Sequence, residues 1–287
     1  MKKTKIDWAD STWNPVTDCL HGCEYCYARG IANRFAGCDK LSTYMPNCQA
    51  TWRRVNPDSK PVDAIFEVDA QCPPINIFFD AKMQKVVRRT APYPWGFQPT
   101  LRRDKLSEPS NWKKPRTIFV CSMADLFGEW VPDDWIKQVF EACEAAPQHR
   151  YMFLTKNPKR YAELRAKGIR PPANSWIGTS ATTDAEAKEQ TFALSECWNV
   201  NANWFVSVEP ILEPISSEAL QDLGAMHWVI IGAETGNSKN KVIPERKWVD
   251  EIVDACAKVG TPLFMKASLR ELMGNDFKQE FPWEGTI

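Results

Sequence analysis

The sequence predicts an α/β fold, a partial (β/α) barrel, for residues 1–287. Short apolar runs alternate with amphipathic helical segments, which is the pattern of a parallel sheet covered by helices. Polar residues follow the end of every apolar run. Because barrel active sites lie at the carboxyl ends of the strands, this distribution favours a barrel over a doubly wound open sheet with one switch point.

Seven strand-forming runs can be followed along the chain. The first, residues 12–17, precedes a cysteine-rich loop and a helical pattern over 28–36. The later strands are expected at 117–121, 151–154, 175–178, 204–208, 228–231 and 262–265, with helices over 132–146, 158–168, from 184, from 216 and over 248–259. Asn157 is expected to cap the helix that begins at Pro158, and Gly168 to end it.

Residues 38–92 interrupt this rhythm with several prolines and one strand-like run at 75–79. A length of 287 residues with 44% hydrophobic content fits one barrel domain with an insertion here better than two independent domains. The insertion contains Cys38, Cys48 and Cys72. Their spacing matches no cluster motif, so they are either ligands of a second cluster or ordinary thiols.

Cys19, Cys23 and Cys26 form a C-x3-C-x2-C loop directly after the first run. Closely spaced thiolates are soft ligands for zinc or an iron-sulfur cluster. A four-iron cluster held by three cysteines leaves one iron open to a substrate or cofactor. A structural zinc site with His21 or Cys38 as fourth ligand is the alternative, although closed zinc sites usually bring their ligands in two pairs. Ten scattered cysteines without a signal peptide do not indicate a disulfide framework.

This loop resembles that of the radical S-adenosylmethionine (SAM) superfamily, including the aromatic Tyr25 before the last cysteine. The phrases at 13–17, 118–127, 153–158 and 207–210 are similar to a phage-borne and bacterial three-cysteine-motif family of unassigned reaction. The resemblance implies a six-stranded partial barrel with the seventh run as an extra strand. It also implies a [4Fe-4S] cluster on the three cysteines whose open iron binds SAM. Reductive cleavage of SAM then gives a 5'-deoxyadenosyl radical that abstracts hydrogen from a substrate.

Further candidates for binding SAM or substrate are Tyr25, Ser122, Asp125, Lys156, Thr179, Ser180, Glu209 and Glu234. The resemblance places Tyr25 beside the adenine. It places Ser122 and Asp125 where the superfamily binds the SAM amino group, although the usual glycines and glutamate are absent. The adjacent Thr179 and Ser180 are candidates for the ribose or carboxylate, and Lys156 for the carboxylate or substrate. One of the two glutamates is expected to touch SAM or substrate, the alternative for either being a rim salt bridge.

The substrate is indicated less directly. With 36 basic and 36 acidic residues, no global field points to nucleic acid or membrane. Residues 93–116 interleave aromatic and basic side chains, as single-stranded nucleic-acid binding does. The alternative is a solvated loop whose aromatics cover the barrel edge. The absence of a signal peptide or hydrophobic span predicts a cytoplasmic protein without a membrane partner.

We therefore expect a radical SAM enzyme acting on a nucleic-acid base or nucleotide, reduced by a donor such as flavodoxin or ferredoxin. The alternative is a non-enzymatic zinc or iron-sulfur module that binds nucleic acid. That module predicts a closed four-ligand site and no SAM binding. Dinucleotide, Walker, H-E-x-x-H and G-x-S-x-G motifs are absent, so the commonest hydrolase and nucleotide-dependent classes have no support. The oligomeric state is not predicted.

Overall fold

The computed structural model describes residues 4, 6–35, 42–44, 52–54, 64–68, 75–197, 203–235 and 241–283. The chain divides into two compact units. The cysteine unit comprises Thr12–Pro115 and Phe119–His149, and the carboxy-terminal unit comprises Met1–Ser11, Arg116–Ile118 and Arg150–Ile287. The three cysteines of the insertion lie outside the described residues. The expected division into one barrel domain with an insertion stays a prediction.

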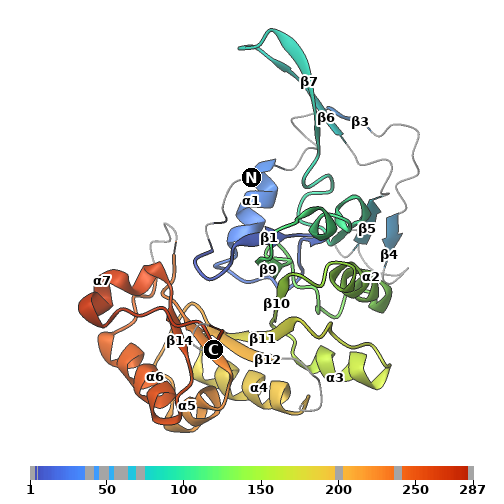
Figure 1. Ribbon diagram of the computed structural model, residues 1–287. Coiled ribbons are helices and arrows are strands. Elements are labelled where there is room, and N and C mark those ends of the chain that lie inside the picture. The colour runs from blue at the N-terminus through green and yellow to red at the C-terminus, as the bar shows by residue number, and fades with distance from the viewer. Residues whose placement is uncertain are drawn as a thin grey trace. The chain divides into compact units, whose positions relative to one another are not determined.

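The main sheet has seven strands and forms a half-barrel, which confirms the predicted fold class (Figure 1). Its order is β1, β9, β10, β11, β12, β13, β14. The strands span Ser11–Trp13 (β1), Thr117–Val120 (β9), Arg150–Thr155 (β10), Ser175–Ala181 (β11), Asn203–Val208 (β12), Trp228–Ile231 (β13) and Leu263–Met265 (β14). The seventh predicted run, β14, lies at one edge of the sheet, and the register is parallel from β10 to β14.

Helices alternate with these strands as the apolar spacing predicts. They span Tyr27–Phe35 (α1), Asp133–Glu144 (α2), Lys159–Ala166 (α3), Asp184–Ser195 (α4), Ser217–Gly224 (α5), Arg246–Val259 (α6) and Arg270–Met273 (α7). Gly168 ends α3 as expected, with φ +76° and a hydrogen bond from Ile169 N to Leu164 O. None of the described helices is long and apolar enough to cross a membrane.

Three local expectations were wrong. The cap of α3 is Pro158 rather than Asn157, whose backbone N–H instead donates to Thr155 Oγ1 at 2.9 Å. Strand β11 continues to Ala181, so Thr179 and Ser180 lie inside the strand and not after it. The single run expected at 12–17 is two strands, β1 and β2 (Val16–Thr17), because Pro15 between them has no N–H to give to a ladder.

The insertion contains more strands than the sequence predicted. Short strands lie within it at Ser42–Tyr44 (β3), Trp52–Arg54 (β4), Ala64–Val68 (β5), Ile75–Asp80 (β6) and Lys85–Thr90 (β7). After the insertion come Thr100–Arg102 (β8) and two 3-10 turns, Arg103–Lys105 and Pro109–Asn111. Strands β2, β8, β5 and β4 form one small sheet, and β3, β6 and β7 form another. Strands β6 and β7 are an antiparallel hairpin that pairs from Ile75 with Thr90 to Asp80 with Lys85.

Tryptophans in the carboxy-terminal unit serve packing. Trp228 in β13 is fully buried and lies within 6.2 Å, centroid to centroid, of six other aromatic rings. These rings belong to Trp8, Trp176, Phe205, Phe264, Phe281 and Trp283. Tilted and edge-to-face ring pairs of this kind stabilise the core beyond the effect of burying their apolar area.

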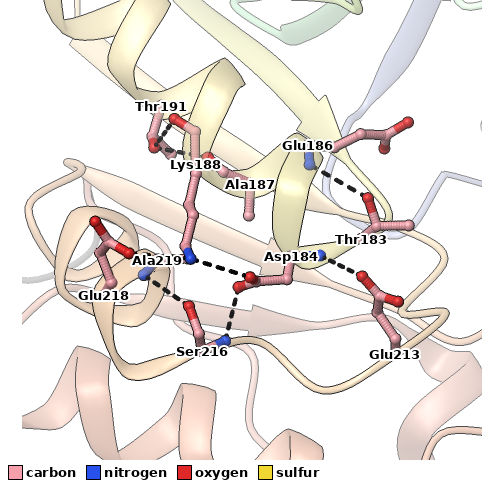
Figure 2. Close-up of polar contacts among 10 residues, drawn as sticks. All are labelled: Thr183, Asp184, Glu186, Ala187, Lys188, Thr191, Glu213, Ser216, Glu218 and Ala219. Atoms are coloured by element: carbon pink, nitrogen blue, oxygen red, sulfur yellow. Dashed lines mark hydrogen bonds and ion pairs between the residues drawn. The ribbon is translucent and has the colours of Figure 1, made fainter.

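Polar contacts fix the starts of α4 and α5 (Figure 2). Thr183 caps α4 by accepting a hydrogen bond from Glu186 N at 3.2 Å. Asp184 Oδ1 accepts from Ser216 N at 2.8 Å, and Asp184 N donates to Glu213 Oε1 at 2.8 Å. The Ser216 N–H holds the pKa of Asp184 below its usual value. The connection after β12 is thereby held against the start of α4, on the side of the sheet where strand-end candidates lie.

Candidate metal centre and active site

The three cysteines of the C-x3-C-x2-C motif lie on one loop between β2 and α1. All three are free thiols and partly exposed. The loop turns through positive φ values at Asp18 (+73°) and Gly22 (+75°), where a glycine carries no steric cost. Cys26 N donates to Cys23 O at 3.3 Å, and Cys26 Sγ accepts from the backbone N of Arg29 at 3.4 Å.

The donor set fits an iron-sulfur cluster. The pKa of the Cys19 thiol is raised to about 12, mainly by burial; a backbone hydrogen bond from His21 opposes the shift, and the charges of Asp125, Cys23 and Cys26 add to it. Within the described residues, no three His, Cys, Asp or Glu side chains are placed to hold one metal ion. In a four-iron cluster each cysteine binds a different iron, so the sulfurs do not have to converge on one point. Iron binding would supply the positive charge that deprotonates these thiols.

The segment that follows β9 lies beside the cysteine loop. Asp18 N donates to Met123 O at 2.8 Å, and Asp18 and Ala124 form a parallel bridge. The phenol of Tyr27 donates to Ser122 O. The structure therefore brings Ser122 beside the helix that follows the cysteine loop, and its role in binding SAM stays a prediction.

Asp125 makes the most specific of these contacts. Its Oδ2 lies 2.7 Å from His21 Nε2, in the middle of the cysteine loop, and its Oδ1 accepts from Phe127 N at 2.9 Å. The Asp125 side chain is 7% exposed and that of His21 22%. The His21 ring also packs edge-on against Trp130, with ring centroids 4.9 Å apart. Sequence reasoning considered His21 only as a zinc ligand, and no local pattern pairs it with a carboxylate so far along the chain.

Two other groups near the loop are informative. Tyr25, the aromatic of the motif, is 37% exposed, so its ring has open surface. Asp18 is buried, and burial raises the pKa of its carboxyl to about 8. Its Oδ2 accepts from Thr17 Oγ1 at 2.7 Å, whereas Oδ1 has no hydrogen-bond partner in the described part of the chain. An unsatisfied buried oxygen is costly, and here it lies at the entry to the cysteine loop.

In the carboxy-terminal unit the structure separates the two β11 candidates. Thr179 is fully buried, and its Oγ1 lies 3.0 Å from both Thr155 O and Gln190 Oε1 of α4. Side chains alternate along a strand, so Ser180 points to the opposite face from Thr179. Ser180 is 9% exposed and is therefore the better ligand candidate. Lys156 directly follows β10 and is half-buried.

Glu209, after β12, is paired with Lys266, after β14, across the end of β13. Gly232 lies between them: a Cβ there would be 3.2 Å from Lys266 Cδ and 3.3 Å from Glu209 Oε1. Glu234 Oε2 accepts from Val242 N at 3.0 Å. Glu209 thus forms the rim salt bridge considered as an alternative. Both it and Glu234 nevertheless remain partly exposed at strand ends.

The aromatic and basic stretch at 93–116 is largely used for packing. Arg102 is fully buried, and Trp95 stacks on Phe66 with centroids 4.4 Å apart and planes 3° from parallel. Arg103 is 2.8 Å from Glu67. These contacts favour the alternative in which this stretch covers the scaffold. Lys113 and Lys114 remain exposed within it.

The protein is an α/β half-barrel with a loop of three free cysteines before its first helix. The chain belongs to the family described as protein of unknown function (DUF5131), which matches residues 3–272. No curated protein matches the sequence.

Among solved structures, the chain is similar to a cysteine-to-serine variant of spore photoproduct lyase, with 11% identity and a TM-score of 0.50 over 92% of this chain and 79% of that one. A second variant of that lyase, with bound AdoMet and dinucleoside spore photoproduct, has 11% identity and a TM-score of 0.46 over 90% of this chain and 63% of that one. At 11% sequence identity, the similarity to the first of these structures shows a shared fold and nothing more.

Proposed function

We propose that this protein is a radical SAM enzyme. The observation that carries the proposal is the loop between β2 and α1 of a half-barrel, which holds three free, partly exposed thiols, Cys19, Cys23 and Cys26. This set leaves one iron of a [4Fe-4S] cluster without a protein ligand. When bound, the reduced cluster supplies the electron that cleaves SAM to methionine and a 5'-deoxyadenosyl radical. A flavodoxin-like or ferredoxin-like donor would supply that electron.

Each of the two units carries side chains that suit parts of SAM or of a substrate. Tyr25 offers an exposed aromatic face from the cysteine loop itself. Ser180, Glu234 and the Glu209–Lys266 pair offer a hydroxyl, carboxylates and an ammonium at the carboxyl ends of β11 to β14, where barrel enzymes bind their ligands. These groups suit the hydroxyls, amine and carboxylate of SAM.

The proposed substrate is a nucleic-acid base or nucleotide, and the β6–β7 hairpin supports it better than the 93–116 stretch. Lys82 and Lys85 are exposed at the hairpin turn, beside Met83 and Val86, which are 48% and 62% exposed. Residues 81–90 contain no acidic residue, and the basic ones are Lys82, Lys85, Arg88 and Arg89. Cations that neutralise phosphates beside apolar side chains that contact bases are typical of nucleic-acid surfaces.

Anaerobic reconstitution tests the proposed reaction. We expect roughly four irons per chain and, on reduction by dithionite with SAM, formation of 5'-deoxyadenosine. Cys23→Ala should abolish deoxyadenosine formation. Cys197→Ala, which removes a buried thiol of the other unit, is the matched control and should retain it. One tightly bound zinc and no SAM cleavage would instead establish a metal-binding module.

Charge reversal tests the substrate. Lys82→Glu with Lys85→Glu should weaken binding to a single-stranded oligonucleotide, measured by fluorescence anisotropy. It should also reduce the magnitude of the negative slope of log affinity against log salt by about 1.4, as expected for two lost phosphate contacts. The same reversal at Lys113 and Lys114 is the matched control. If that control weakens binding and the hairpin variant does not, the contact lies in the 93–116 stretch.

A further inference from the structure

We infer that Asp125 and His21 form a positioning pair that fixes the conformation of the cysteine loop. The segment 122–125 touches this loop at three places: before it at Asp18, in its middle at His21, and after it at Tyr27. The first contact is made by backbone groups, and the third joins an exposed tyrosine to a backbone carbonyl. Of these three contacts, only the middle one joins two side chains, the imidazole of His21 and the carboxylate of Asp125.

The geometry of the middle contact suits a fixed pair. The 2.7 Å separation of His21 Nε2 and Asp125 Oδ2 is that of a charge-assisted hydrogen bond. The other Asp125 oxygen is held by Phe127 N, so the carboxylate cannot rotate without losing that bond. Trp130 packs against the ring of His21, with centroids 4.9 Å apart. Both partners are therefore oriented before any ligand binds.

The position of His21 in the sequence explains how the pair can act on the cysteines. It lies between Cys19 and Cys23, with Gly22, at φ +75°, directly after it. Glycine adopts this φ without steric cost but adopts other values as readily, so Gly22 does not by itself fix the conformation of the loop. Holding His21 therefore limits where the sulfurs on either side can lie. The inference makes Asp125 a positioning residue for the cluster ligands.

Hydrogen-deuterium exchange of the metal-free protein tests the pair without any cluster. We expect His21→Ala and Asp125→Ala each to speed exchange of amides in residues 19–26 by roughly tenfold, the factor for losing a hydrogen bond to a charged group. The double variant should be no faster than either single one, because the pair acts as a unit. His21→Gln, which keeps a donor at the place of Nε2, should restore slow exchange.

Glu24→Ala is the matched control, since it removes an exposed carboxylate from the same loop and should leave exchange unchanged. Exchange at wild-type rates in His21→Ala, or effects that multiply in the double variant, would overturn the inference. Asp125→Ala also loses the hydrogen bond from Phe127 N and could fail to fold. In that case His21→Ala and His21→Gln still show whether the pair orders the cysteine loop.

The inference refers to a cluster and in that respect rests on the proposed function. Measuring iron retention tests the two separately. After reconstitution, His21→Ala should lose iron to a chelator severalfold faster than wild type and His21→Gln. A wild-type protein that takes up no iron would refute the proposed function, while the exchange result would still decide whether the pair orders the loop. Equal retention in wild type and His21→Ala would remove the pair's role in holding the cluster.

Discussion

Replacing Arg102 with methionine should destabilise the cysteine unit strongly. The Arg102 side chain is fully buried and that of Asp104 is 12% exposed. Arg102 Nε and Nη2 donate to the two Asp104 oxygens at 2.9 and 2.8 Å. Its Nη1 donates to Ala91 O at 2.9 Å and to Pro92 O at 3.1 Å. Methionine keeps the apolar stem but removes all four hydrogen bonds.

The size of the effect follows from what remains. Removing one partner of a buried ion pair costs about 3–5 kcal/mol, because the other charge is left buried and unpaired. Since Asp104 keeps some contact with solvent, we expect about 3 kcal/mol, a large fraction of a typical stability of about 5–15 kcal/mol. Arg102→Lys keeps the charge without the two-pronged geometry, so its loss should be about 1–2 kcal/mol.

Urea unfolding followed by both circular dichroism and tryptophan fluorescence measures these losses, provided that the two transitions coincide. Combining Arg102→Met with Asp104→Leu should recover part of the stability, because no unpaired charge remains. A loss below about 1 kcal/mol in Arg102→Met would refute the reasoning. If Arg102 instead contacts a polyanion, the variant would lose oligonucleotide affinity with unchanged stability.

Two further predictions concern the carboxy-terminal unit. Gly178→Ala would place a Cβ 2.5 Å from Phe205 Cε1 and 2.6 Å from Phe205 O, and should cost about 1–3 kcal/mol or more by thermal unfolding. The control lies in α1 of the cysteine unit: Gly30→Ala, where an added Cβ would meet nothing within 4 Å, should be neutral or stabilising by up to about 1 kcal/mol. His227 Nδ1 accepts from Trp204 N at 3.0 Å, and burial lowers the pKa of His227 from 6.5. The contribution of neutral His227 to the free energy of unfolding should be present above pH 6.5 and lost as the pH falls through the folded pKa. In His227→Asn the urea midpoint should therefore depend less on pH in this range. The same pH dependence in the variant and in wild type would contradict this.

Patterns local in sequence predicted the half-barrel well. Periodic apolar spacing located the helices around Ile136 and Ile252, and the apolar runs located β9 to β14, because each pattern reflects one buried face. The details that failed depend on partners elsewhere. Asn157 is a good cap by type, but α3 begins two residues later. Thr179 is polar at a strand end, yet its hydroxyl faces α4.

Predicting the candidate site had the same limit. The cysteine spacing located the loop without any structure, since all three cysteines lie within eight positions. The role of His21 depends on Asp125, which is 104 positions away, and no periodicity connects them. Arg102 looked like part of a basic surface because residue type alone does not show that its partner, Asp104, lies beside it in a buried site.

The contacts between the cysteine loop and the segment after β9 close a loop that contains the entire insertion. The entropy of closing such a loop grows only with the logarithm of its length, so doubling or halving the enclosed chain changes the closure free energy by about 0.6 kcal/mol. His21 and Asp125 bound 104 positions of chain. Lengthening or shortening the chain at 55–63 or 69–74, between β4 and β5 or between β5 and β6, should therefore change the stability of the cysteine loop very little. The insertion can vary in length, and acquire or lose a binding surface, without altering how the cysteines are held.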